Sequence, residues 1–331
     1  MRDFINETVR ALPPSGIRRF FNLASEMKDV VSLGVGEPDF LTPWNIREEA
    51  IYSLEKGRTV YTANAGLMEL RKELSHYLKR KYSLEYDPAS QLLITVGGSE
   101  AIDIALRTIL MPGDEVLIPE PSFVSYKPCA IMAGGKAVVV PLHGENGFKL
   151  TVRDLEGLVT EKTKVLVFPY PGNPTGATMS KKDMEELCRF ICEKDLFVLS
   201  DEIYAELTYD EPHTSIASMP GMYERTLVIN GFSKAFSMTG WRLGYAAGPK
   251  ELLEQMTKVH QFAIMCAPTT SQYAAIEALK NCDRAVEEMK QEYNRRRRLV
   301  VSKLREMGLP CSDPSGAFYV FPCIRSTGMT S

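Results

Sequence analysis

From about residue 90 onward, short apolar runs alternate with helical segments, and this alternation limits the folds open to the chain. The runs have the length and near-continuous apolar character of buried strands, and helical segments such as 181–194 lie between some of them. Such strands are typical of a mostly parallel sheet covered by helices on both faces. We therefore predict an α/β fold with seven strands, at 91–96, 115–118, 137–142, 164–168, 196–199, 226–229 and 243–246.

The chain of 331 residues is long enough for two domains. We predict a large domain over 46–284 that contains the sheet, and a smaller α/β domain over 285–331. Residues 1–45 are expected to form an N-terminal arm and part of the smaller domain. A helical stretch from Thr269 to Met307 is expected to break near 281–283, and 315–321 are expected to form a strand. Ser99 is predicted to cap the helix that follows the first strand.

Composition argues against several classes of partner. A net charge of −3 gives no reason to expect nucleic acid or an anionic membrane. The longest apolar runs are strand-sized, and the N-terminus lacks the apolar stretch of a signal peptide. The seven cysteines have no Cys-x-x-Cys spacing and no histidine beside them, which favours free thiols over a disulfide framework or a metal site. We therefore predict a cytoplasmic protein with no metal.

Small, polar and aromatic residues follow the predicted strands, where ligands bind in open parallel sheets. Each could be a plain turn residue or helix cap, but their coincidence at one edge is hard to explain by turns alone. They are Gly97, Gly98 and Ser99 at a helix start, Phe123, Asn173 in a rigid turn, Asp201 with Tyr204 three residues on, and Lys234 with Arg242.

Lys234 is the most informative of these residues. It lies in a small-residue turn between two apolar segments, where its amine would be partly desolvated. Desolvation lowers the pKa of a lysine and makes it a usable nucleophile. The alternative is a strand-loop-strand connection whose lysine points to water, and the turn alone does not decide between them.

Together these groups match what pyridoxal 5′-phosphate (PLP) requires of a protein, which is a Schiff-base lysine and an acidic partner for the pyridinium nitrogen. Lys234 is expected to bond the cofactor and then to act as general base, and Asp201 to keep the ring nitrogen protonated. Asn173 and Tyr204 are expected to hydrogen-bond the ring oxygen, with Phe123 stacked on the ring. The phosphate is assigned to Gly98, Ser99 and Arg242, and Glu100 and Ser233 complete the predicted cofactor-binding set.

The motifs Asn173-Pro174-Thr175-Gly176, Ser200-Asp201-Glu202-Ile203-Tyr204 and Ser233-Lys234 carry a resemblance that covers nearly the whole chain. With segments 34–40, 61–66, 240–242 and 314–319, the sequence resembles a class I aminotransferase of the fold-type-I PLP superfamily. The resemblance implies a transaminase that moves an amino group between an L-amino acid and a 2-oxo acid by a ping-pong mechanism. It further implies that Gly36 and Asn173 contact the substrate. Tyr61 would reach the phosphate of the partner subunit in a homodimer with shared active sites.

Finer features resemble one subfamily. Segments 15–18, 207–210 and 328–331 are most similar to N-acetyl-L,L-diaminopimelate aminotransferases, which implies that compound and 2-oxoglutarate as substrates.

Two features depart from the family pattern. Gly231 stands where many members have a phosphate-binding serine, and Ser233 is a candidate to compensate. Family members also carry an arginine beyond the segment 316–319 that clamps the substrate α-carboxylate, and no residue here is assigned that role. If the protein ends at Ser331, we expect PLP to bind and transamination to be severely impaired.

Other functions remain to be weighed. A PLP-dependent C–S β-lyase would use the same cofactor and eliminate a leaving group from Cβ. A non-catalytic PLP-binding regulatory domain would need a helix-turn-helix module, for which no residues are available before Gly34. A nicotinamide dehydrogenase is set aside, because the segment 34–38 lacks the third glycine of the dinucleotide fingerprint and contains Pro38.

Overall fold

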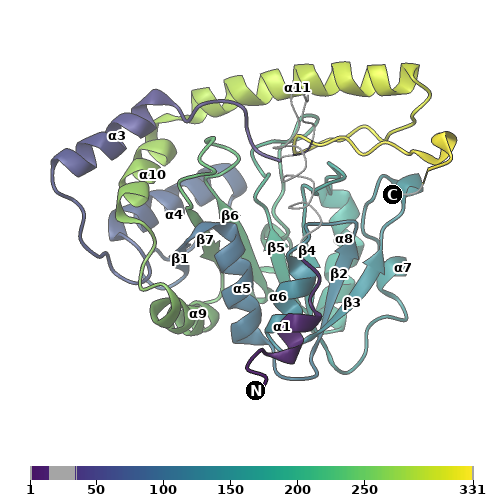
Figure 1. The fold of residues 1–331 in the computed structure, drawn as a ribbon, viewed down its shortest axis with the longest axis horizontal. Helices are drawn as coiled ribbons and strands as arrows, with labels where there is room; N and C mark the ends of the chain where they lie inside the picture. Colours follow the sequence, from purple (N-terminus) through teal and green to yellow (C-terminus); the bar gives the residue numbers. More distant parts are fainter. Residues whose placement is uncertain (1, 15–33, 35, 330–331) are drawn as a thin grey trace.

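A seven-stranded sheet forms the centre of the molecule (Figure 1). The computed structural model describes residues 2–14, 34 and 36–329. The strands are β1 (Leu92–Thr95), β2 (Glu115–Glu120), β3 (Lys136–Pro141), β4 (Thr163–Phe168), β5 (Phe197–Asp201), β6 (Thr226–Gly231) and β7 (Gly244–Ala247). Their order is β1-β7-β6-β5-β4-β2-β3, and β7 runs antiparallel to β1 and β6 while the other neighbours pair in parallel. The predicted mostly parallel α/β sheet is confirmed.

Helices cover both faces of this sheet (Figure 1). One face packs on α5 (Gly97–Ile109), α6 (Tyr126–Met132) and α9 (Lys250–Ala263). The other packs on α4 (Met68–Tyr82) and α10 (Thr269–Asn281) near β1 and β7, and on α8 (Lys181–Glu193) near β4 and β5. Successive strand residues point to opposite faces, so Leu93 joins the first layer while Leu92 and Ile94 join the second. Burial on both sides explains why these strands are apolar throughout.

The long helical stretch divides where the sequence predicts. The first part, α10, ends at Asn281, and α11 (Asp283–Glu306) begins after Cys282 and runs along one side of the molecule beside the C-terminal segment (Figure 1). The remaining elements are α1 (Glu7–Ala11), α3 (Trp44–Glu55), α7 (Val152–Leu155), η1 (Gly144–Asn146), η2 (Ile216–Ser218), η3 (Tyr223–Arg225) and η4 (Arg325–Thr327).

Two local predictions are wrong. Ser99 does not cap α5, because the helix already begins at Gly97, and its N-cap residue Val96 makes no side-chain cap bond. The segment 315–321 is not a regular strand, although Gly316 forms an isolated bridge with Thr208. Ala317 adopts a left-handed backbone conformation with φ of 55°, which interrupts the extended run.

Further expectations concern thiols and membranes. All seven cysteines are free. Within the part of the chain that the structure describes, no helix is both long and apolar enough to cross a membrane. The segment 15–18 and residues 330–331, which carry part of the subfamily resemblance, lie outside the described residues.

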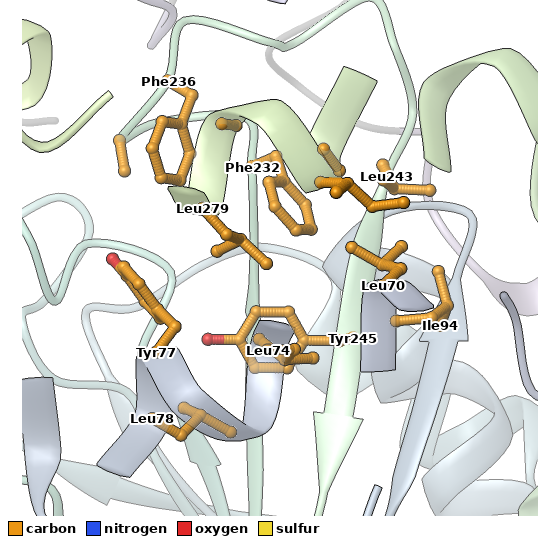
Figure 2. Packing of buried hydrophobic residues seen from close by; sticks show 14 of the residues in the cluster. Leu70, Leu74, Tyr77, Leu78, Ile94, Phe232, Phe236, Leu243, Tyr245 and Leu279 are labelled. Carbon is orange, nitrogen blue, oxygen red and sulfur yellow. The ribbon is translucent and has the colours of Figure 1, made fainter. Parts of the chain in front are cut away.

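The turn after β6 is anchored in the core. Phe232 and Phe236 are buried, their ring centroids lie 5.8 Å apart, and both point into the apolar layer that Leu74 and Leu279 help to form (Figure 2). Lys234 lies between these two anchors in the sequence. Its main chain is therefore held by apolar packing on either side, and this fixes the position of its Cα atom.

The topology brings distant segments to one edge of the sheet. The carboxyl ends of β1, β2, β4, β5 and β6 meet there because these strands run in the same direction. Since β7 runs the opposite way, its beginning lies at that edge, and Arg242 precedes it by two residues. This arrangement explains why the residues after five strands and before a sixth can share one site.

Candidate active site

A cavity of about 440 Å³ opens at this edge of the sheet. Its volume is within the range of roughly 300–1,000 Å³ typical of small-molecule sites. All the predicted site residues except Glu100 and Tyr61 line it, namely Gly36, Gly98, Ser99, Phe123, Asn173, Asp201, Tyr204, Ser233, Lys234 and Arg242.

The amine of Lys234 enters this cavity from the turn after β6. Its Nζ donates a 2.5 Å hydrogen bond to the carbonyl oxygen of Gly36. Burial lowers the pKa of Lys234 to about 8; Arg242 also lowers it, whereas the carboxylates of Glu37 and Asp201 act in the opposite direction. An amine with this pKa is partly uncharged near neutral pH, so it can act as a nucleophile or a base.

Asp201 is the last residue of β5, and its carboxyl group is buried. Tyr126 donates a 2.7 Å hydrogen bond to Oδ2, and the main-chain amide of Ile203 donates to Oδ1 at 3.2 Å. Burial raises the pKa of Asp201, and these two hydrogen bonds offset part of that rise. A buried acid of this kind is suited to pairing with a cationic N–H group placed in the cavity.

Two tyrosines meet beside Lys234. The hydroxyl groups of Tyr204 and Tyr319 are 2.6 Å apart, and Asn173 is near enough to act on the pKa of Tyr204. Burial raises the pKa of Tyr204 well above its ordinary value, so the phenol keeps its proton and can donate it in a hydrogen bond. Gly36 is required here, since a Cβ atom at this position would lie 2.1 Å from the hydroxyl oxygen of Tyr319.

Another part of the cavity is suited to an anion. Gly98 and Ser99 lie in the first turn of α5, where the main-chain N–H groups have no partner within the helix. Arg242 lies over the start of this turn, because a Cβ atom on Gly97 would lie 2.7 Å from its Nη2. Gly97 has a φ of 75° as well, so both the backbone and the guanidinium require glycine. Free N–H groups beside a guanidinium favour a phosphate.

Glu100 and Tyr61 are the two predicted residues that lie elsewhere. The carboxylate of Glu100 accepts a hydrogen bond from the Val96 amide and contacts His260, so it is turned away from the cavity. In this conformation the carboxylate does not line the cavity, and its contact with the cofactor stays a prediction. Tyr61 is 80% exposed on the outer surface of the chain.

Several lining residues carry no role in the sequence analysis. Tyr126 follows Phe123 by three residues, a spacing that would have placed it beside the predicted site at the start of a helix. Tyr319 was part of a matching motif, but the motif alone does not show its contact with Tyr204. The others are Glu37, Ile102, Ser122, Val124, Pro169, Pro171, Pro174, Ile203 and Thr239.

Comparison with known proteins identifies the family. The model for "Aminotransferase class I and II" matches residues 28–330. The chain belongs to this family. It is 51% identical over 321 residues to an aspartate aminotransferase of Pyrococcus abyssi, covering 96% of this chain and 82% of that protein.

Two further relatives share the architecture or the sequence over nearly the whole chain. A probable N-acetyl-LL-diaminopimelate aminotransferase of Bacillus subtilis is 45% identical over 331 residues, which is 100% of this chain and 84% of that protein. The crystal structure of an aromatic aminotransferase from Pyrococcus horikoshii superposes with a TM-score of 0.89 at 49% identity, covering 95% of this chain and 84% of that one. The protein is thus a PLP-dependent aminotransferase of fold type I, as the sequence predicts.

The residues present fit this cofactor. The cavity combines a part-buried lysine, a buried carboxyl group that has no cation among its described hydrogen bonds, and a group of residues suited to an anion. The close approach of Arg242 to Gly97 leaves no room for a side chain there, so the anion site stays open. An amine, an acid and a phosphate cradle are the three groups that PLP needs.

Proposed function

We propose that Lys234 binds PLP covalently and afterwards moves the proton during transamination. The observation that carries this proposal is the pKa of Lys234, lowered to about 8, in the same cavity as the buried carboxyl group of Asp201. A surface lysine would keep a pKa near its ordinary value. A base whose pKa lies near the working pH is the most effective proton carrier.

When bound, PLP supplies an electron sink for the pair left on the substrate α-carbon. Asp201 holds the proton on the ring nitrogen that this sink requires. Its burial raises its own pKa, but a cationic N–H group beside it favours the ionised carboxylate, because each charge offsets the desolvation of the other. Tyr126 strengthens this preference by donating to the same carboxylate.

With the cofactor bound, the Nζ atom of Lys234 would take the proton from the substrate α-carbon, hold it, and return it as general acid. For this the amine has to leave Gly36, whose carbonyl oxygen it contacts. The main-chain amide of Gly36 is then assigned to the substrate α-carboxylate, together with the side-chain amide of Asn173. Both residues line the cavity beside the amine.

Other residues hold the cofactor in place. Gly98, Ser99 and Arg242 would bind the phosphate, and Ser233, which also lines the cavity, would add a hydroxyl group. Tyr204 and Asn173 would donate hydrogen bonds to the ring oxygen, with Tyr204 oriented by its contact with Tyr319. Phe123 would stack on the ring, and it is itself packed edge-on against Tyr126, with ring centroids 5.7 Å apart.

The reaction we propose runs in two halves, in which an L-amino acid leaves as its 2-oxo acid before the acceptor 2-oxo acid enters. For the donor we propose N-acetyl-L,L-diaminopimelate, with 2-oxoglutarate as acceptor. The subfamily resemblance of segment 207–210 and the Bacillus subtilis relative support it. Relatives named for aspartate and for aromatic amino acids make these the competing donors. Spectral titration of the holoenzyme with all three classes of donor separates them.

We further propose that the enzyme is a cytoplasmic homodimer with shared active sites. Large apolar side chains are exposed where the segment around Tyr61 lies beside the end of α9, among them Val60, Phe262 and Met265. Thr269 hydrogen-bonds the carbonyl oxygen of Val60, which joins the two segments into one surface. A surface of this kind favours a protein partner, and a second subunit would place Tyr61 near the phosphate of its neighbour. The seven free thiols favour a reducing compartment.

One labelling experiment tests the central assignment. Borohydride reduction of the holoenzyme, followed by peptide mapping, should place a pyridoxyl group on Lys234. A label on another lysine would show that the assignment is wrong. K234R serves as the matched control, since it keeps a cation in the turn and should take up no label.

A further inference from the structure

A buried His–Glu pair lies directly behind the anion site. His260, from α9, is 0% exposed, and its Nδ1 is 2.6 Å from Oε1 of Glu100. We assign the proton to Nδ1, which then donates to the carboxylate oxygen. The other ring nitrogen, Nε2, has no hydrogen-bond partner among the described residues. The proposed mechanism uses neither side chain.

The two oxygens of Glu100 have different partners. Oε1 accepts from His260, while Oε2 accepts from the main-chain amide of Val96, the residue immediately before α5. Both contacts hold the carboxylate against Val96 and His260. Glu100 does not line the cavity, although Gly98 and Ser99 beside it do.

A carboxylate in the first turn of α5 can weaken the binding of a phosphate there. It would be attracted to the same free N–H groups at the start of the helix, and it would repel a phosphate dianion at short range. This turn packs tightly, since a Cβ atom on Gly244 would lie 2.5 Å from the main chain of Gly97 and Gly98. The backbone of the turn therefore has no room to shift. The direction of the Glu100 side chain therefore matters to the site.

We propose that His260 is a positioning residue for the phosphate of the cofactor. By donating to Oε1, it keeps the carboxylate of Glu100 on Val96 and away from the N–H groups of Gly98 and Ser99. This inference rests on the proposed phosphate site and adds a residue that acts on it from the opposite side of α5.

Stability alone does not account for the pair. A buried polar or ionic pair can often be replaced by apolar side chains of similar volume without loss of stability. The unpartnered Nε2 atom of His260 adds a further cost to burying this ring. Positioning of Glu100 gives the histidine a function that an apolar residue could not supply.

The test compares two ligands, PLP and pyridoxal, which differ only by the phosphate group. Dissociation constants are measured on the apoenzyme for wild type and H260L. In H260L the affinity for PLP should fall by about tenfold or more, the size of one charge-assisted contact, while the affinity for pyridoxal should change little. Equal losses for both ligands, or no loss for either, would overturn the proposal.

A second substitution isolates the charge. In the double variant H260L/E100Q no carboxylate remains to be misdirected, so PLP affinity should return to within about threefold of wild type. This variant leaves no unpaired buried charge, so it tests the proposal even where H260L does not fold. A double variant that still lacks the preference for PLP over pyridoxal would refute the proposal.

His213 offers a matched control. It forms another His–Glu pair among the described residues, with Nε2 2.8 Å from Oε2 of Glu202, and Glu202 is next to Asp201 in the sequence. H213L should leave the ratio of PLP to pyridoxal affinity unchanged. If wild type itself shows no preference for PLP over pyridoxal, the proposed phosphate site fails, and this result is distinct from a failure of His260 alone.

Discussion

The hydroxyl group of Tyr126 donates a 2.7 Å hydrogen bond to Oδ2 of Asp201, and both side chains are almost completely buried. The bond joins the first residue of α6 to the last residue of β5, across 75 positions of sequence. It favours the ionised form of a carboxyl group whose pKa burial raises. We therefore propose that Tyr126 supports Asp201 in its pairing with the ring nitrogen of PLP.

The variant Y126F should lower activity by about 10- to 100-fold, because a hydrogen bond to a buried charged group contributes roughly 1.5–3 kcal/mol. Removal of the donor raises the pKa of Asp201 further and weakens its pairing with the ring nitrogen. Steady-state kinetics measures the effect. Y86F is the control, since Tyr86 is also buried but its hydroxyl group has no partner among the described residues. Equal activities of the two variants would contradict the role of Tyr126.

The variant D201N should lose about 10²–10³-fold or more in the rate of transamination, the usual scale for removal of a preorganised electrostatic partner. The amide keeps the shape of the side chain and can still accept the hydrogen bond from Tyr126, so the fold should persist. Binding of PLP should weaken at the same time. Single-turnover kinetics and the dissociation constant of PLP report the two effects separately, and near-normal turnover would rule out the ring-nitrogen role.

The pH dependence of cofactor capture follows from the pKa of Lys234. Burial lowers that pKa to about 8, and only the uncharged amine attacks. The rate at which the apoenzyme bonds PLP should therefore rise about tenfold per unit between pH 6 and the pKa, then level off above pH 8–9. Stopped-flow absorbance measures this rate. A rate that keeps rising toward pH 10.5 would mean that Lys234 behaves as a surface amine.

The variant G231S should destabilise the protein by about 1–3 kcal/mol rather than improve phosphate binding. A Cβ atom at this position would lie 3.0 Å from the carbonyl oxygen of Leu243 and 3.1 Å from Cα of Gly244, both in the main chain. G240S is the matched control, because a Cβ atom there meets nothing within 4 Å. Denaturant unfolding compares the two, and tighter PLP binding by G231S would argue against this explanation of the glycine.

Mixing two variant subunits, at a PLP concentration low enough to leave Y61A largely empty, tests the shared active site. K234A lacks the reactive amine, and Y61A should lose about tenfold or more in affinity for the partner's PLP. If Tyr61 acts across the interface, a mixed dimer contains one site with both residues intact. An equal mixture should then recover about a quarter of wild-type activity, since half of the dimers are mixed and each has one working site. Activity equal to the mean of the two parents would place Tyr61 in its own subunit or outside the site.

Much of the fold follows from local patterns. Strand length, apolar character and the helices between strands are properties of short segments, so all seven strands and the break between α10 and α11 could be predicted. Non-local effects were harder to predict. The segment around Ala317 has an apolar strand-like sequence, but its left-handed backbone is set by contacts with Leu207 and Thr208.

The sequence by itself determined the sheet, the cofactor class and the position of Lys234 and Asp201 at strand ends, because parallel strands bring their carboxyl ends to one edge. Only the tertiary structure decided where side chains from separate layers meet. The bond from Tyr126 to Asp201, the contact of Tyr204 with Tyr319 and the turning of Glu100 toward His260 each join residues from different elements. Such contacts depend on how helices pack on the sheet, and no local spacing encodes that packing.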